Sequence, residues 1–274
     1  MLFEDLCSVR LREWRTALDT RYRLVFLQGM ALAEKYPPPL VRQMSDVDLF
    51  LPDGGAEELR LVLESAGARR YRDYGNVWVV SGLMIDIHQD PWGADRIRAR
   101  RFCAPGDPLT FSESNRYPGF YVLSPRQLFS QTVLHGLKHG FQRLVWDLDL
   151  LALHRAGYDR ISGSQTAAAL DNIASDRLSR VWGIKDAPQS GAMPGMRLRC
   201  AARIIRQWPG EGTGEIALAL CCGKWRQTVA CIAESFLPSK RVMAEMYGPG
   251  AYWLMVIKRL WALLRMSKRI LKRA

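Results

Sequence analysis

The sequence predicts an α+β fold, with a short mixed sheet and helices over residues 1–123 and an all-helical domain over residues 124–274. Strand-like segments rich in β-branched residues occur in the first half, whereas the second half shows helical spacing of its apolar residues. At 274 residues, of which 48% are hydrophobic, the chain is long enough for two modest domains that each have a core.

The first predicted elements lead up to a pair of aspartates. Residues from about 4 to 35 have helical spacing, with an interruption near "VFLQGM", where Gly29 can serve as a turn. The segment "SDVDLFLP" then predicts a short strand, because Val47 and Leu49 alternate with Asp46 and Asp48.

A helix and a hairpin complete the first predicted domain. "AEELRLVLESAG" fits a helix that Gly67 closes. "NVWVVSGLMIDIHQD" predicts two strands joined by a short turn at Ser81-Gly82, which places Asp86 on a strand. A passage rich in Pro, Gly and Ser follows from Ala104 to Gly119.

The second half begins at a helix start near Ser124. Ser124 is the expected N-cap and Pro125 the first helical residue, and one long helix is predicted over residues 126–157. The remainder has helical character with interruptions at 186–195 and 208–214, so we expect a helical bundle.

The net charge and the cysteines indicate the kind of partner and the cellular compartment of the protein. The net charge of +12 indicates an anionic partner, such as nucleotide phosphate, nucleic acid or anionic lipid. Seven basic residues and no acid lie in 251–274, so over half of the excess is concentrated there. The six cysteines lack C-x-x-C spacing, and we find neither a signal peptide nor an apolar stretch of roughly 18 residues. We expect a cytoplasmic protein, peripheral at the inner face of the membrane if its basic segment binds lipid.

Asp46 and Asp48 should project from the same face of their strand, because side chains at i and i+2 share a face. Adjacent carboxylates repel each other unless a cation neutralises them, and Mg²⁺ binds carboxylate, water and phosphate oxygens. Asp86, on a neighbouring strand, is the candidate third ligand. Three carboxylates can hold two ions about 3.5–4 Å apart, the arrangement for in-line nucleotidyl transfer. By itself, however, a D-x-D pair is more often an ordinary exposed strand face.

The order of the motifs along the chain supports the interpretation of the aspartates as metal ligands. The chain shows "FLQGMAL", Arg42, "SDVDLFL", "ELRLVLESAGAR" and "MIDIHQDPW", and later "FYVLSPRQLF", "HGLKHGFQRLVWDLDLLAL" and "FLPSKRVMAEMYG". This series resembles the uncharacterised bacterial nucleotidyltransferase family of the DNA polymerase β-type superfamily. The resemblance covers most of the chain and implies a minimal polymerase β-type nucleotidyltransferase domain in the first half.

The resemblance also implies roles for single residues. Asp46, Asp48 and Asp86 would bind two Mg²⁺ ions, for which Mn²⁺ can substitute, and Asp86 would draw a proton from the acceptor hydroxyl. Gly29 would allow close approach of a triphosphate at a helix N-terminus. Two residues depart from the pattern, since Gln28 replaces a frequent Lys and Met30 replaces a Ser of the wider superfamily. Arg42 is the nearest cation to compensate. The expected nucleotide-binding residues are Gln28, Gly29, Met30, Arg42 and Ser45.

The expected activity is transfer of a nucleoside monophosphate from a nucleoside triphosphate to a hydroxyl. The acceptor would be a small metabolite, a sugar, a peptide or a protein side chain. The alternative is an inactive module that binds a nucleotide or a partner protein; Gln28 and Met30 favour it, whereas the complete aspartate set argues against it. A third hypothesis is an adaptor at the membrane surface.

Histidines and an arginine are candidates for the acceptor site or the cleft. His88 shares the strand face of Asp86, and it would contact the metal shell, the nucleotide or the acceptor, or else cap a strand end. His135 and His139 have the i, i+4 spacing of zinc ligands, but no third ligand is evident. We favour a polar stripe that packs this helix on the first domain, with Arg143, Asp147 and Asp149 as partners. His139 and Arg143 could still line the cleft.

The segment 251–274 combines apolar residues at helical spacing with basic residues toward its end. Docking of its first half on the bundle and binding to anionic lipid are equally favoured, and a solvated basic tail is a further alternative. Nucleic-acid binding ranks lower, because no recognised nucleic-acid module accompanies the segment.

Overall fold

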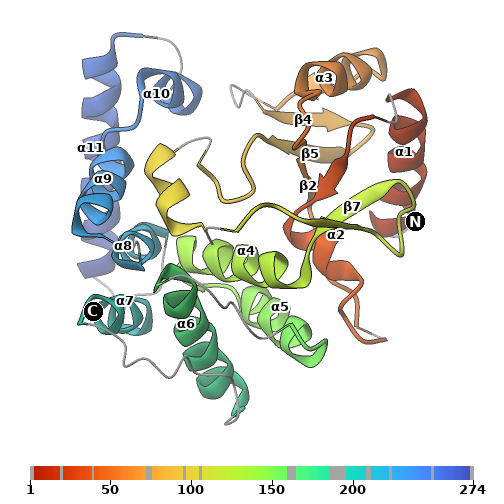
Figure 1. Ribbon diagram of the computed structural model, residues 1–274. Helices are drawn as coiled ribbons and strands as arrows, with labels where there is room; N and C mark the ends of the chain where they lie inside the picture. Colours follow the sequence, from red (N-terminus) through yellow and green to blue (C-terminus); the bar gives the residue numbers. More distant parts are fainter. Residues whose placement is uncertain are drawn as a thin grey trace. The chain divides into compact units, whose positions relative to one another are not determined.

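A computed structural model describes most of the chain (Figure 1), namely residues 3–18, 21–38, 40–71, 76–94, 97–104, 107–158, 165–184, 196–207, 211–221, 224–247 and 250–271. Its contacts define two compact units. The sheet unit comprises Met1–Pro91 and Pro108–Leu128, and the helical unit comprises Trp92–Asp107 and Phe129–Ala274. The domain boundary expected between residues 123 and 124 stays a prediction, because a compact unit need not be an independent domain.

The described residues of the sheet unit form a seven-stranded mixed sheet in the order β3-β4-β5-β2-β1-β7-β6. β2 pairs in parallel with β5, and β1 in parallel with β7, whereas the other neighbours are antiparallel. The strands are β1 (Leu24–Phe26), β2 (Asp46–Phe50), β3 (Arg69–Arg70), β4 (Val77–Val80), β5 (Leu83–His88), β6 (Phe111–Glu113) and β7 (Phe120–Leu123). The helices of this unit are α1 (Phe3–Ala17), α2 (Gln28–Ala33) and α3 (Ala56–Ser65). The predicted α+β class is confirmed.

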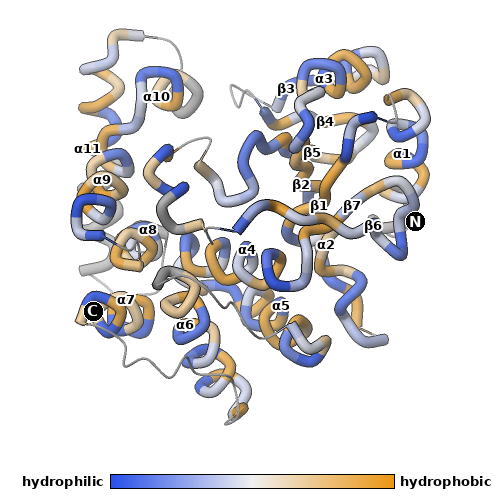
Figure 2. The backbone as a smooth tube through the Cα atoms, viewed as in Figure 1, coloured by the Kyte–Doolittle hydropathy of each residue, from blue (hydrophilic) through white to orange (hydrophobic). Residues whose placement is uncertain are grey.

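The central strands divide their side chains between a core face and a polar face. Val47, Leu49 and Ile85 are fully buried, and Figure 2 shows the hydrophobic character of the central strands β1 and β2. Burial of this apolar surface stabilises the sheet by roughly 25 cal/mol per Å². Asp48 on β2 and Asp86 on β5 alternate with these buried residues. Their side chains therefore project from the opposite, polar face of the sheet.

The hairpin and the helix of the first half form as predicted. Val80 pairs with Leu83, and the turn residues Ser81 and Gly82 have φ angles of 49° and 82°. Two left-handed residues in a two-residue turn define the type that matches the twist of a hairpin. α3 ends before Gly67, whose φ of 79° is the left-handed conformation that closes many helices.

Two parts of the sheet were not predicted. Residues 24–26 form the central strand β1 where only an interruption of a helical region was expected, and residues 111–113 form β6 inside the passage rich in Pro, Gly and Ser. β1 has only three residues, all of them buried. It therefore lacks the polar and apolar alternation by which a strand is distinguished from a helix.

The helical unit contains the 3-10 helix η1 (Arg98–Cys103), most of α4 (Pro125–Lys138), and α5 to α11. The later helices are α5 (Leu144–Arg155), α6 (Gln165–Trp182), α7 (Met196–Gln207), α8 (Glu211–Cys221), α9 (Trp225–Phe236), α10 (Lys240–Tyr247) and α11 (Tyr252–Leu271). Within the described residues, no helix is both long and apolar enough to cross a membrane.

The single long helix predicted over residues 126–157 is wrong, because the chain turns between α4 and α5. Gly140 and Phe141 have φ angles of 64° and 48°. Their backbone N–H groups donate to the carbonyls of Leu137 (2.9 Å) and Gly136 (2.8 Å), which is the Schellman pattern of a helix end. The Phe141 ring lies over Gly136, where an added Cβ would be 2.4 Å from Cε1 of the ring.

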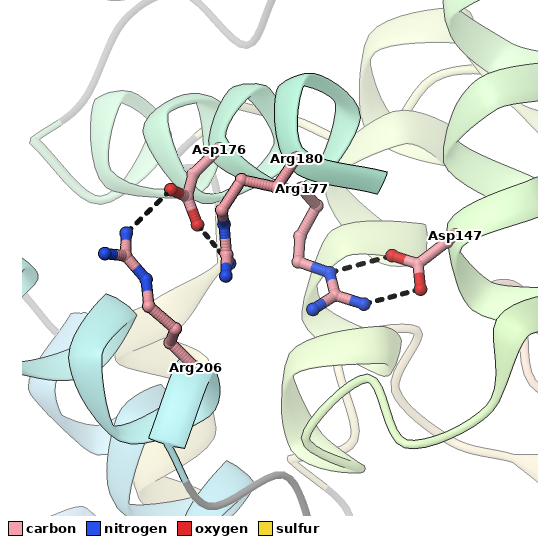
Figure 3. Close-up of polar contacts among 5 residues, drawn as sticks. All are labelled: Asp147, Asp176, Arg177, Arg180 and Arg206. Atoms are coloured by element: carbon pink, nitrogen blue, oxygen red, sulfur yellow. Dashed lines mark hydrogen bonds and ion pairs between the residues drawn. The ribbon is translucent and has the colours of Figure 1, made fainter. Parts of the chain in front are cut away.

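A buried ion pair holds α5 to α6 (Figure 3). Arg177 donates from Nε and Nη2 to the two carboxylate oxygens of Asp147, at 2.8 and 2.5 Å, and its guanidinium also lies 5.0 Å from the centre of the Phe141 ring. The side chain of Asp147 is 4% exposed and that of Arg177 is 14% exposed. A charge this deeply buried is tolerated because its partner is present.

We predict that Asp147→Ala lowers the free energy of unfolding by about 3–5 kcal/mol, because it leaves the Arg177 charge buried without its carboxylate. Urea unfolding of the full chain measures this loss. The matched control is Arg180→Ala, which breaks the more exposed pair with Asp176 and should cost at most about 1 kcal/mol. Equal losses in both variants would contradict the assigned importance of the buried pair.

Candidate functional site

The parallel pairing of β2 with β5 brings the polar residues of the two strands to one place. Asp48 is the register partner of Asp86, and Phe50 is the partner of His88. Register partners in parallel strands project to the same face, and residues two apart on one strand also share a face. Asp48, Asp86 and His88 therefore lie on the same face of the sheet, and His88 is the last residue of its strand.

These three side chains converge. Nε2 of His88 lies 2.9 Å from Oδ1 of Asp48 and 3.7 Å from Oδ2 of Asp86. Among the described residues, Asp48, Asp86 and His88 form a group whose candidate ligand atoms all lie within 4.8 Å of one another. Asp48 is buried and the other two are partly buried, so the cluster is open to solvent on one side.

Asp46 lies beside this group on β2. Burial raises the pKa of Asp46 above its ordinary value, the negative charge of Asp48 raises it further, and the Ser45 hydroxyl, which donates at 3.2 Å, opposes both. Asp46 contributes no atom to the convergent group. The set of Asp46, Asp48 and Asp86 as metal ligands stays a prediction, and the structure adds His88 to the residues that meet there.

The start of α2 lies next to Asp48. The N–H of Leu27 donates to the carbonyl of Asp48 at 3.0 Å, so Gln28 and Gly29 come directly after a residue that is paired with the backbone of Asp48. Gln28 has a φ of 48°, a left-handed conformation that a residue with a side chain seldom adopts. This strain is typical of functional segments, where the surrounding structure holds it in place.

Gly29 lies against the side chain of Met44. A Cβ at Gly29 would lie 2.8 Å from Cγ and 3.1 Å from Sδ of Met44, so any larger residue would displace that side chain. Met44 was not singled out from the sequence, and its only signal was its place next to Ser45. Arg42 lies on the same side, because its guanidinium would be 3.8 Å from that Cβ and its charge slightly lowers the pKa of Asp46.

His139 and Arg143 belong to the helical unit. The His139 ring stacks on Trp146 with centroids 5.0 Å apart, the His135 ring lies 4.7 Å from that of His139, and Arg143 lies over Trp146. Asp147, one expected partner of this stripe, instead binds Arg177. The placement of His139 and Arg143 in the cleft stays a prediction.

We predict that Asp46→Asn stabilises the metal-free protein near neutral pH. The folded state raises the pKa of Asp46 above its ordinary value of 3.8, so ionisation penalises the folded state increasingly as the pH rises through that raised pKa. The gain in melting temperature in EDTA should therefore increase from acid to neutral pH.

Asp53→Asn serves as the control of opposite sign. The hydrogen bond from Arg23 lowers the pKa of Asp53, so its carboxylate contributes stability above the unfolded-state pKa that is lost as the pH falls through the folded pKa. This variant should melt below the wild type at neutral pH. A gain for Asp46→Asn that shrinks with rising pH would contradict the role of the buried charge.

Comparison with known proteins identifies the chain's family. A family model described as "Uncharacterised nucleotidyltransferase" matches residues 7–178, which is more than half of the chain and includes Gly29, Asp46, Asp48, Asp86 and His88. No curated protein and no solved structure matches the chain. The arrangement of acids on adjacent strands and the extent of this match lead to one conclusion: the chain belongs to this uncharacterised nucleotidyltransferase family.

Proposed function

We propose that the protein is a divalent-metal-dependent nucleotidyltransferase, which moves a nucleoside monophosphate from a nucleoside triphosphate to a hydroxyl of its acceptor. The observation that carries this proposal is the convergence of Asp48, Asp86 and His88 beside the start of α2. A partly buried carboxylate pair on adjacent parallel strands is suited to a cation and to the phosphates that the cation binds.

The donor atoms fit a divalent ion. Two ligands that bind one ion at about 2.1 Å and at a right angle stand about 3.0 Å apart. The separation of 2.9 Å between His88 Nε2 and Asp48 Oδ1 matches this distance, although it also suits a hydrogen bond. Asp46, Asp48 and Asp86 are the proposed ligands of two Mg²⁺ or Mn²⁺ ions, with His88 at the edge of the set. When bound, the ions would neutralise phosphate charge and lower the pKa of the acceptor hydroxyl.

The triphosphate would lie along the start of α2. Leu27 is tied to Asp48, so the backbone of Gln28, Gly29 and Met30 is within the same neighbourhood as the acids. The first N–H groups of a helix attract anions, and Arg42 and Ser45 supply a cation and a hydroxyl on the side of Asp46. Asp86, which is partly exposed, is the proposed acceptor of the proton from the attacking hydroxyl.

The proposed acceptor is a small metabolite, a sugar, a peptide or a protein side chain. We propose that residues of the helical unit determine which acceptor binds. His139 and Arg143 are the proposed contacts there. The His139 ring stacks on Trp146 and the Arg143 guanidinium lies over the same ring, so the two side chains would offer polar groups to an acceptor together.

An inactive module that binds a nucleotide or a partner protein is the second candidate. Gln28 and Met30 favour it, because they replace the Lys and Ser expected near the phosphates. Buried Met30 also presents no hydroxyl to a phosphate. Turnover separates the two candidates, since only the first requires it.

We predict that the protein binds a nucleoside triphosphate only when Mg²⁺ or Mn²⁺ is present. Calorimetric titration of ATP, GTP, CTP and UTP measures this and identifies the donor. Asp48→Asn and Asp86→Asn should abolish the binding, because each removes a carboxylate from the convergent group. Asp53→Asn is the matched control, since its carboxylate lies beyond β2 and pairs with Arg23. Absence of binding by the wild type to all four nucleotides would refute the proposal.

We also predict that His88→Gln weakens Mn²⁺ binding by about 10–100-fold, the usual cost of losing a group that binds or orients a metal ligand. The signal of free Mn²⁺ in electron paramagnetic resonance gives the affinity without any substrate. If His88 is itself a ligand, the bound ion should show coupling to a histidine nitrogen that the variant lacks. An unchanged affinity in His88→Gln would exclude both roles.

A further inference from the structure

One face of α11 is packed into the helical unit. Met255 and Val256 are buried against Met243 of α10. The Tyr252 hydroxyl donates to the carbonyl of Pro238 at 3.1 Å, and Arg259 donates to the carbonyl of Ser235 at 2.7 Å. The first half of α11 is therefore held in a fixed orientation by α9, α10 and the turn between them.

The opposite face of α11 is apolar and exposed. Five large side chains share it, with exposures between 44% and 72%, and we call them the apolar face: Trp253, Leu254, Ile257, Leu260 and Trp261. Their spacing of i, i+1, i+4, i+7 and i+8 confines them to an arc of about a third of the helix circumference. Exposed apolar side chains that gather on one helix face in this way indicate an interaction site.

The segment that contains α11 is strongly basic. Residues 224–274 contain eleven lysines and arginines and two glutamates, so this segment carries a charge of +9 out of the total of +12. Lys258 is exposed next to Ile257, and the helix continues through a sequence that contains Arg265, Lys268 and Arg269. Exposed tryptophans with neighbouring cations match the boundary between lipid headgroups and acyl chains.

We propose that the apolar face of α11 binds the surface of an anionic lipid bilayer, with the helix parallel to the membrane plane. The tryptophans and aliphatic side chains would enter the acyl boundary while the basic residues remain among the headgroup phosphates. Charge favours a lipid surface over a second copy of the chain, because two surfaces of this charge repel each other. Nucleic acid would satisfy the cations but would leave the leucine and isoleucine side chains exposed.

Co-sedimentation of the full-length protein with vesicles tests this proposal. We expect binding to phosphatidylcholine vesicles that contain phosphatidylserine, at least about tenfold stronger than binding to phosphatidylcholine alone. Raising the salt concentration from about 0.1 to 0.5 M should weaken the binding, because salt screens the basic residues. Lys258→Glu should weaken it for the same reason.

The double variant Leu254→Ser/Ile257→Ser tests the apolar face without changing any charge. It should lower the partition coefficient by about tenfold or more, since it removes two large apolar side chains whose transfer out of water favours binding. The matched control is Val9→Ser/Leu61→Ser, because these residues are 54% and 53% exposed in the sheet unit, compared with 60% and 61% for Leu254 and Ile257. The control should bind as the wild type does.

Three results would overturn the proposal. The first is no binding of the wild type to vesicles that contain phosphatidylserine. The second is equal vesicle binding by the Leu254→Ser/Ile257→Ser variant, with circular dichroism showing that its helices are retained. The third is a wild-type dimer in sedimentation velocity that this variant abolishes, which would make a second copy the occupant. None of these results depends on nucleotide binding, so the proposal stands or fails separately from the proposed enzyme activity.

Discussion

The parallel register of β2 with β5 is the constraint on which the candidate site depends. Asp48 lies opposite Asp86 only because Val47 and Leu49 on one strand, and Ile85 on the other, are buried on the core face. A slip of one residue would turn the apolar side chains to the polar face, at a large cost in buried apolar area. The hydrophobic core therefore holds two carboxylates together that would otherwise repel each other.

The negative charges on β2 are electrostatically unfavourable in the folded protein. The raised pKa of Asp46 shows that its charge is unfavourable in this position, first because of burial and then because of Asp48. A site with such a cost is expected where function requires it, since a cation can offset the repulsion only when it binds. The His88 ring lies 2.9 Å from Asp48, so it is placed to form a hydrogen bond with this buried carboxylate.

A glycine decides the change of chain direction between α4 and α5. Gly140 ends α4 and lets Phe141 fold back over Gly136, which produces two helices in place of one. Phe141 then contacts Arg177, which binds Asp147, so the turn and the buried ion pair support each other. In α11, Met255 and Val256 are buried against α10, whereas the apolar face remains exposed.

The sequence by itself determined the class of fold, the strand that carries Asp46 and Asp48, the hairpin that carries Asp86, and the family resemblance that the match over residues 7–178 supports. These features depend on local alternation, turn residues and motif order, which are all readable along the chain. Only the tertiary structure decided that β1 lies between β2 and β7, that Met44 fills the space beside Gly29, and that His88 meets Asp48 and Asp86. The physical reason is that a short buried strand has no periodic signal, and that contacts between residues 40 positions apart depend on strand pairing rather than on local propensity.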